Sequence, residues 1–224
     1  MLTIDVISDV ICPWCFIGKR RLEKALNGHS ATVRWHPFQL NPDMPPEGID
    51  RKFYRIRKFG SWERSQELDA QVAAAGQGER IAFNFENMAR TPNTLDAHRV
   101  IWLAGERGVQ DAVVEALFQA YFTDGLDLSD RATLADVAAE AGLDRAEVEE
   151  LLACDAGLDV VQGGEEQARR LGVSGVPFFV VNGRIALSGA QPPELFRQAF
   201  EQAGVAVVAG EGCEIDPATG KKEC

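Results

Sequence analysis

The sequence lacks several features, and each absence excludes a broad class of function. No apolar run among its 224 residues reaches the ~18–20 residues that a membrane-spanning helix needs. Positive charge is not in excess either, because 23 Lys and Arg stand against 34 Asp and Glu, a formal net charge of −11. Binding to nucleic-acid phosphates or to an anionic membrane surface requires a basic face. We therefore expect neither a nucleic acid nor a membrane among the partners.

A secretion signal is also missing, because no basic region, apolar stretch and cleavage site precede the first predicted strand at Leu2. This absence predicts a cytoplasmic location. Cysteine is scarce, with 5 residues, and the chain is 46% apolar, so it can bury a core without a scaffold of disulfides. Because cytoplasmic thiols are normally kept reduced, a close cysteine pair there is more typical of catalysis, redox sensing or metal binding than of structural cross-linking.

The sequence does contain a close cysteine pair, at a junction between a strand and a helix. Residues 2–7 are predicted to form a strand, and a helix is predicted to begin at Pro13. Cys12 and Cys15 lie at its start, where exposed backbone N–H groups and the positive end of the helix dipole favour a thiolate. Pro13 and Trp14 set the loop between the two thiols, and Trp14 offers a flat apolar surface to a partner chain. Two thiols at this spacing can close on each other as a disulfide.

The first helix is predicted to be amphipathic, with a wet polar face that carries Lys19, Arg20, Arg21, Glu23 and Lys24. Residues 31–38 alternate as a second strand, which should lie parallel to the first. A long stretch with helical periodicity and almost no strand pattern follows. The helices predicted in it are 50–59, 61–75, 94–107, 110–123, 131–141, 145–152 and 157–171.

Strand patterns return near the end of the chain. Residues 176–181 and 184–188 are predicted strands on either side of Asn182-Gly183, the strongest short hairpin pattern. A last helix is predicted at 193–203, and the polar segment after it has the composition of a tail.

These features together resemble a known family. The resemblance is carried by the segments SDVICPWCFIGKRRLEKAL, WHPFQLNPDMP, TPNTLDAHRV, GVSGVPFFVVNGR and SGAQPPELF. The chain is similar to the DsbA-like thiol–disulfide oxidoreductases and, within them, to the FrnE-like branch. The resemblance implies an α/β, thioredoxin-like fold with an inserted all-helical domain and a C-terminal extension. The thioredoxin-like domain would be discontinuous (1–40 and 172–203), with the helical insertion at 41–171 and the extension at 204–224.

The resemblance also implies roles for single residues. Cys12 would be the attacking thiol, and because it precedes the helix we expect it to be exposed. Cys15 would be the resolving thiol, one helical turn later and more buried. Pro177 would be a cis-proline facing the pair, which leaves the Val176 backbone free to pair with an extended substrate segment.

The other three cysteines leave alternatives open. Cys213 and Cys224 could form a second redox pair that exchanges with Cys12 and Cys15, or they could be inert tail thiols. All four could in principle bind zinc, but the tail spacing is not that of a zinc knuckle, so no metal is expected. Cys154, on a predicted helix, is expected to be buried and inert.

Some histidine, basic and aromatic residues also have two interpretations. His98 either faces the active-site groove or is structural, whereas His36 is expected to be a packed side chain. The basic run at 51–58 is expected to be a solvated face. Aromatic side chains could line a substrate groove or belong to the helical core; they are Phe53, Tyr54, Phe59, Trp62, Phe83 and Phe85.

The function predicted from the sequence is that of a cofactor-free protein thiol–disulfide oxidoreductase, which acts by disulfide exchange as an oxidase of thiols or an isomerase of disulfides. Its partners would be proteins with thiols or disulfides, together with a small thiol or a thioredoxin-type protein for recycling. One alternative is a small-molecule enzyme similar to kappa-type glutathione transferases and chromene-carboxylate isomerases, although these place Ser where Cys12 stands. The other is a redox-linked chaperone whose helical cap and cleft hold unfolded chains.

Overall fold

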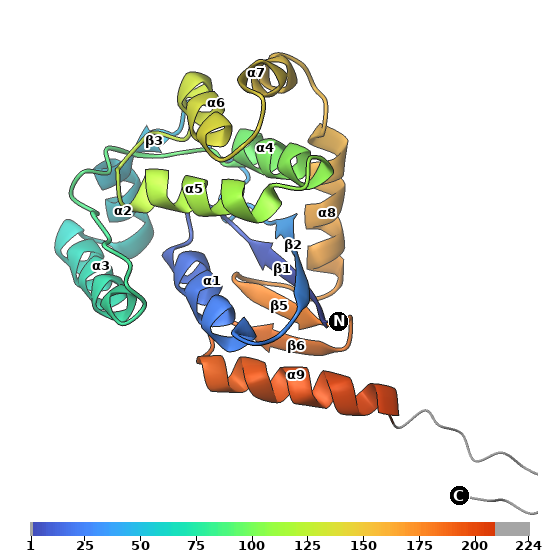
Figure 1. The fold of residues 1–224 in the computed structure, drawn as a ribbon. Coiled ribbons are helices and arrows are strands. Elements are labelled where there is room, and N and C mark those ends of the chain that lie inside the picture. Colours follow the sequence, from blue (N-terminus) through green and yellow to red (C-terminus); the bar gives the residue numbers. More distant parts are fainter. Residues whose placement is uncertain (1, 209–224) are drawn as a thin grey trace, which may run out of the picture.

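A mixed four-stranded sheet organises the fold, with the strands in the order β2-β1-β5-β6 (Figure 1). The structure is a computed structural model that describes residues 2–208. β1 (Leu2–Ser8) and β2 (Ala31–Pro37) are parallel and are joined by α1 (Pro13–Leu26). β5 (Phe178–Val181) is antiparallel to β1, and β6 (Ile185–Ser188) is antiparallel to β5. The predicted β-α-β unit and C-terminal hairpin are both present.

Both faces of the sheet are covered by other elements. Because successive side chains of a strand point to opposite sides, the strands contribute to two separate cores. Ile4 and Val6 belong to the main core, which they share with Phe179 and with residues of α1 and of α9 (Pro193–Val208). On the opposite face, α8 (Leu158–Arg170) covers the sheet (Figure 1). A smaller core fills that side and consists of Ile7, Phe38, Ala168 and Val173.

The segment between β2 and β5 contains all seven predicted helices, with ends within two residues of the predicted ones. Four of these helices begin at a side-chain cap, in which an oxygen of Asp50, Ser61, Asp130 or Asp144 accepts a hydrogen bond from the N–H three residues later. Besides α8 the helices are α2 (Arg51–Phe59), α3 (Trp62–Gln77), α4 (Leu95–Glu106), α5 (Gln110–Phe122), α6 (Arg131–Glu140) and α7 (Arg145–Ala153).

Two details differ from the sequence-based prediction. A short antiparallel pair, β3 (Ile49–Asp50) and β4 (Arg90–Thr91), lies within the helical segment. Two residues are too few to show a period, so no pattern could reveal them. The last helix continues to Val208, because Gly204 costs a helix interior only ~1 kcal/mol and therefore need not end it. No helix within residues 2–208 is both long enough and apolar enough to cross a membrane.

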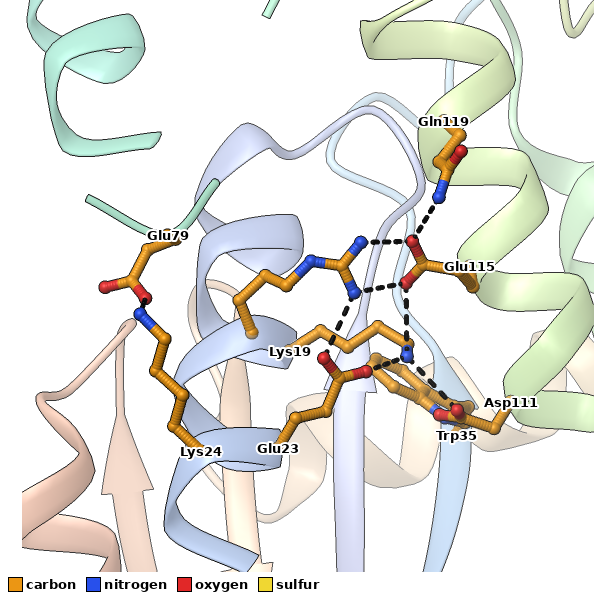
Figure 2. Close-up of polar contacts among 9 residues, drawn as sticks. Lys19, Glu23, Lys24, Trp35, Glu79, Asp111, Glu115 and Gln119 are labelled. Atoms are coloured by element: carbon orange, nitrogen blue, oxygen red, sulfur yellow. Dashed lines mark hydrogen bonds and ion pairs between the residues drawn. The ribbon is translucent and has the colours of Figure 1, made fainter. Parts of the chain in front are cut away.

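The polar face of α1 is not entirely wet, and the prediction is wrong for Lys19. Its side chain is 3% exposed and pairs with Glu23 on the same helix and with Asp111 and Glu115 on α5, at 3.1 and 3.2 Å (Figure 2). Trp35 Nε1 on β2 donates a hydrogen bond to Asp111 Oδ1 at 3.0 Å. Burial lowers the pKa of Lys19, but the three carboxylates, Asp111 foremost, outweigh it and raise the pKa above its usual value. Lys19 therefore fastens the helix that carries the cysteine pair to the helical segment.

Candidate active site

The cysteine pair lies in a tight turn at the start of α1. Cys12 is the residue that caps this helix, with extended backbone angles of φ −93° and ψ 109°, and Pro13 occupies the first helical position. Cys12 N–H donates to the carbonyl of Asp9 at 3.0 Å, and Cys15 N–H donates to the carbonyl of Cys12 at 2.9 Å. Both cysteines are free thiols. The sulfur of Cys12 therefore lies at the N-terminal end of α1, which is the positive end of the helix dipole.

Cys12 is less exposed than predicted. It is 5% exposed and Cys15 is 1% exposed, whereas Trp14 between them is 41% exposed. The prediction for Cys12 was wrong because chain remote in sequence packs over it, which local spacing cannot show. Cys12 is nevertheless not sealed, because together with Pro13 and Trp14 it lines a cavity of about 320 Å³.

The loop before β5 forms one of these remote contacts. The Val176–Pro177 peptide bond is cis, as the resemblance implies. Cys12 Sγ lies 3.5 Å from the carbonyl oxygen of Val176 and donates a hydrogen bond to it. Gly18 permits this arrangement, since a Cβ there would lie 3.1 Å from Pro177 Cγ and 3.0 Å from Phe179 Cζ. The sequence did not identify Gly18 as a site residue, because a glycine within a helical pattern gives no sign of which remote residue packs against it.

The two thiols have different surroundings. Burial raises the pKa of the Cys15 thiol well above its usual value, and the adjacent sulfur of Cys12 raises it further. Hydrogen bonds from the Ser8 side chain and the Asp9 backbone oppose this shift only in part. At neutral pH Cys15 is therefore a protonated thiol, which suits a group that reacts second.

Comparison with known proteins agrees with this geometry. The family described as DSBA-like thioredoxin domain matches residues 3–201. The chain belongs to this family. It is similar to the probable DsbA oxidoreductase SCO1869 from Streptomyces coelicolor, with 33% identity, 96% of this chain and 93% of that chain covered, and a TM-score of 0.85. The FrnE-like branch stays a prediction.

Two further structures share the fold of this DsbA-like protein at lower identity. One is a 2-hydroxychromene-2-carboxylate isomerase, with 16% identity, 94% and 100% coverage of the two chains and a TM-score of 0.71. The other is the cytosolic disulfide reductase DsbM from Pseudomonas aeruginosa with GSH, with 20% identity, 91% and 99% coverage and a TM-score of 0.60. At these identities the likeness shows the fold alone.

The cavity of this DsbA-like protein is rich in cations. Arg51, Arg55 and Lys58 of α2 line it, and Asp69 is the only carboxylate among its described lining residues. Asp69 is shared, because its two oxygens lie 2.7 Å from Arg51 Nη2 and 2.5 Å from Arg55 Nη2. Burial lowers the pKa of Arg55, and the charge of Arg51 lowers it further against the opposing effect of Asp69. Lys58 donates a hydrogen bond to Tyr54 Oη at 2.7 Å and has no carboxylate of the cavity lining as its partner. With three cationic side chains and one carboxylate, the described lining of the cavity has a net positive charge.

The basic run is therefore not simply a solvated face, as was predicted, since Arg51 is buried. Of the six aromatic candidates, Tyr54, Phe59 and Phe85 line the cavity, whereas Phe53 is 54% exposed. Phe83 packs in the core against Phe16 and Phe122, and Trp62 lies beside Arg51; neither lines the cavity.

The remaining candidates lie elsewhere or outside the described residues. Cys154 is exposed, contrary to the prediction, because it caps the end of α7. His36 is half-exposed, with Nε2 2.8 Å from Asp5 Oδ1. Within the described part of the chain, no group of three or more His, Cys, Asp or Glu residues could hold a metal ion. Cys213 and Cys224 fall outside the described residues.

Proposed function

We propose that this DsbA-like protein exchanges thiols and disulfides with protein substrates through Cys12 and Cys15, in the cytoplasm. One observation carries the proposal. Cys12, at the start of a helix, lines a cavity, while Cys15 is buried behind it as a protonated thiol. A pair with one accessible and one shielded sulfur can form a mixed disulfide with a partner and then resolve it.

The exchange has two steps. The Cys12 thiolate attacks one sulfur of a substrate disulfide and forms a mixed disulfide, while the other substrate sulfur leaves as a thiolate with the electron pair of the broken bond. Cys15 then loses its proton and attacks the sulfur of Cys12. The second substrate sulfur leaves as a thiolate, so the substrate is reduced and the pair is oxidised. The same steps in reverse oxidise a substrate dithiol.

The region around Cys12 also suits a polypeptide substrate. Trp14 gives a half-exposed apolar surface beside the sulfur, and the Val176 carbonyl lies 3.5 Å from it. A substrate segment in extended conformation could pair with the Val176 backbone, as in other cases of strand addition.

The cations of the cavity favour a second candidate, a small thiol that carries carboxylates, as substrate or recycling partner. Arg51 and Arg55 share the Asp69 carboxylate and Lys58 bonds Tyr54 Oη, so three cations line the cavity against one carboxylate. Carboxylates are the natural partners of guanidinium and ammonium groups. The DsbM structure that shares this fold contains GSH, a compound of this class. Glutathione conjugation, the activity of a kappa-type transferase, is the form of this candidate that does not need both cysteines.

Activity assays on cysteine variants separate these candidates. With insulin or scrambled ribonuclease as substrate, Cys12→Ser should abolish exchange, and Cys15→Ser should accumulate a mixed disulfide visible by mass spectrometry. Glutathione conjugation that persists in Cys15→Ser would favour the small-molecule enzyme. Suppression of aggregation that persists in Cys12→Ala, without exchange activity in the wild type, would favour a chaperone.

A further inference from the structure

Arg21 of α1 joins three separate parts of the chain around the active site. The helix that carries it begins directly after Cys12. Its Nε lies 2.7 Å from Oε1 of Glu79, which follows α3, and its Nη1 donates a hydrogen bond to the carbonyl oxygen of Ala190 at 2.5 Å. Ala190 belongs to the loop between β6 and α9. A guanidinium group can hold both partners at once, because its donors form a rigid planar fork.

The ion pair with Glu79 fixes the guanidinium in place. The side chain of Glu79 is 9% exposed, and that of Arg21 is 21% exposed. Burial raises the pKa of Glu79, but the hydrogen bonds and charges of Lys24 and Arg21 outweigh it and hold the pKa below its usual value. Glu79 is therefore ionised at neutral pH. Lys24 pairs with its other oxygen (Figure 2) and donates a hydrogen bond to the Gly78 carbonyl, so both polar contacts of Lys24 lie beyond the end of α3.

The loop that Arg21 contacts supports the segment beside the reacting sulfur. Gly189 of this loop donates its N–H to the carbonyl oxygen of Pro177 at 2.8 Å. Val176, the residue before it, carries the oxygen that accepts the hydrogen bond from Cys12 Sγ at 3.5 Å. A short series of contacts thus connects the guanidinium to the carbonyl that lies against the sulfur.

This segment is where a substrate polypeptide would pair. Under the proposed function, an extended substrate lays its backbone along Val176 while its sulfur meets Cys12. A misplacement of about 1 Å, even from a change remote from the chemistry, can slow a reaction about 10²-fold. β6 is the last strand of the described sheet, so no further strand there steadies the loop that follows it. The contact from α1 supplies such support.

We propose that Arg21 is a positioning residue for polypeptide substrates, which holds the loop after β6 and, through it, the Val176–Pro177 segment beside Cys12. This inference rests on the proposed function, because it concerns how a substrate backbone meets the reacting sulfur. Arg21 therefore matters for disulfides in polypeptides and not for a small disulfide that has no backbone to pair. A residue needed only for folding would affect both kinds of substrate alike.

Three variants isolate the contact with the loop. Arg21→Met removes both contacts of the guanidinium group. Arg21→Lys keeps the positive charge beside Glu79 but offers a single nitrogen in place of the fork. Lys24→Met is the matched control, because it removes a cation from the same helix and the same carboxylate without touching the loop after β6.

The test compares two disulfides in single-turnover reactions of the reduced protein. Insulin supplies a polypeptide disulfide, and its concentration dependence gives a half-saturating concentration and a limiting rate. 5,5′-Dithiobis(2-nitrobenzoate) supplies a small disulfide, whose coloured thiolate is followed by absorbance. The half-saturating insulin concentration should rise at least fivefold in Arg21→Met and at least twofold in Arg21→Lys, while the rate with the small disulfide stays within twofold of the wild type. Lys24→Met should leave both reactions unchanged.

An unchanged half-saturating concentration of insulin in Arg21→Met would overturn the inference. Equal losses with both disulfides would overturn it too, because they indicate general damage to the fold. If Arg21→Met fails to fold, Arg21→Lys carries the test with its own twofold threshold.

Hydrogen exchange gives a readout that needs no activity. The Gly189 amide, which donates to Pro177, should exchange at least tenfold faster in Arg21→Met or, if that variant does not fold, in Arg21→Lys. An unchanged exchange rate refutes the role of Arg21. If the wild type reacts with the small disulfide but with neither insulin nor scrambled ribonuclease, the proposed function fails, and hydrogen exchange still decides whether Arg21 holds the loop.

Discussion

Replacing Lys19 by Met tests whether the buried ion cluster fastens α1 to α5. The substitution keeps an unbranched side chain that is one heavy atom shorter, and it removes the one charge that meets Glu23, Asp111 and Glu115 together. Removing one partner of a buried pair costs about 3–5 kcal/mol, because a charge is left uncompensated. Here the cost is smaller, because the carboxylates of Asp111 and Glu23 are 58% and 42% exposed and Glu115 keeps Arg20.

The expected loss is therefore about 2–3 kcal/mol of unfolding free energy. For a chain of this size it corresponds to a fall in Tm of about 4–12 °C, measurable by calorimetry or circular dichroism. Lys24→Met is the control, since it makes the same change on the same helix. The side chain of Lys24 is 47% exposed, so its loss should cost less than about 1 kcal/mol.

The pH dependence of this difference follows from two opposite shifts. Burial raises the pKa of Glu115, but Arg20, Gln119 and Lys19 outweigh it and hold the pKa below its usual value, so this contribution is lost as pH falls below ~4.3. The folded-state pKa of Lys19 is raised, so its contribution is complete below ~10.4 and is lost as pH rises further. The gap in Tm between the wild type and Lys19→Met should be flat between about pH 5 and 10 and shrink outside that window. A Lys19→Met protein as stable as the wild type at pH 7 would refute the reasoning.

Two further predictions concern the helix and the tail. Gly18→Ala should destabilise the fold by about 1–3 kcal/mol and slow exchange, because the new Cβ would lie 3.0 Å from Phe179 Cζ. Gly163→Ala is the control, because no atom lies within 4 Å of the new Cβ in α8 and the fold should not lose stability. Equal Tm values for the two variants would contradict this account. Cys213 and Cys224 should form a reversible disulfide that exchanges with the active-site pair; finding both free, by thiol counting and peptide mapping, under conditions that oxidise that pair would end this idea.

Much of the fold is predictable because it depends on local chemistry. Asn182 and Gly183 adopt positive φ values of 50° and 65° between β5 and β6, as the Asn-Gly hairpin pattern predicts. The periodic segments between β2 and β5 are helices, and α6 begins at a local cap in which the Asp130 side chain accepts a hydrogen bond from Thr133 N–H. Such features need only a few neighbouring residues, which the sequence shows directly.

The site is less predictable because its contacts join residues far apart in the chain. The pair Cys12 and Cys15 is visible as a motif, but the contact of Cys12 with Val176 spans 164 positions. The burial of Lys19 depends on α5, 92 positions away at Asp111, so an amphipathic pattern alone placed it in solvent. His98 could be assigned to the neighbourhood of Asp9 only once the packing of α4 against the sheet was known.

The packing of α8 has a consequence for how the helical segment relates to the rest of the molecule. By position in the sequence, α8 belongs to the insertion, yet its Ala168 packs with Ile7 of β1 and with Phe38, which directly follows β2. Joining residue 40 directly to residue 172 would remove Ala168 and expose that core to water, so the shortened chain should be less stable than the full one. The inserted segment therefore contributes to the core of the sheet. A change that loosens α8 also exposes the sheet to water, and β1 of that sheet leads directly into the turn that holds Cys12.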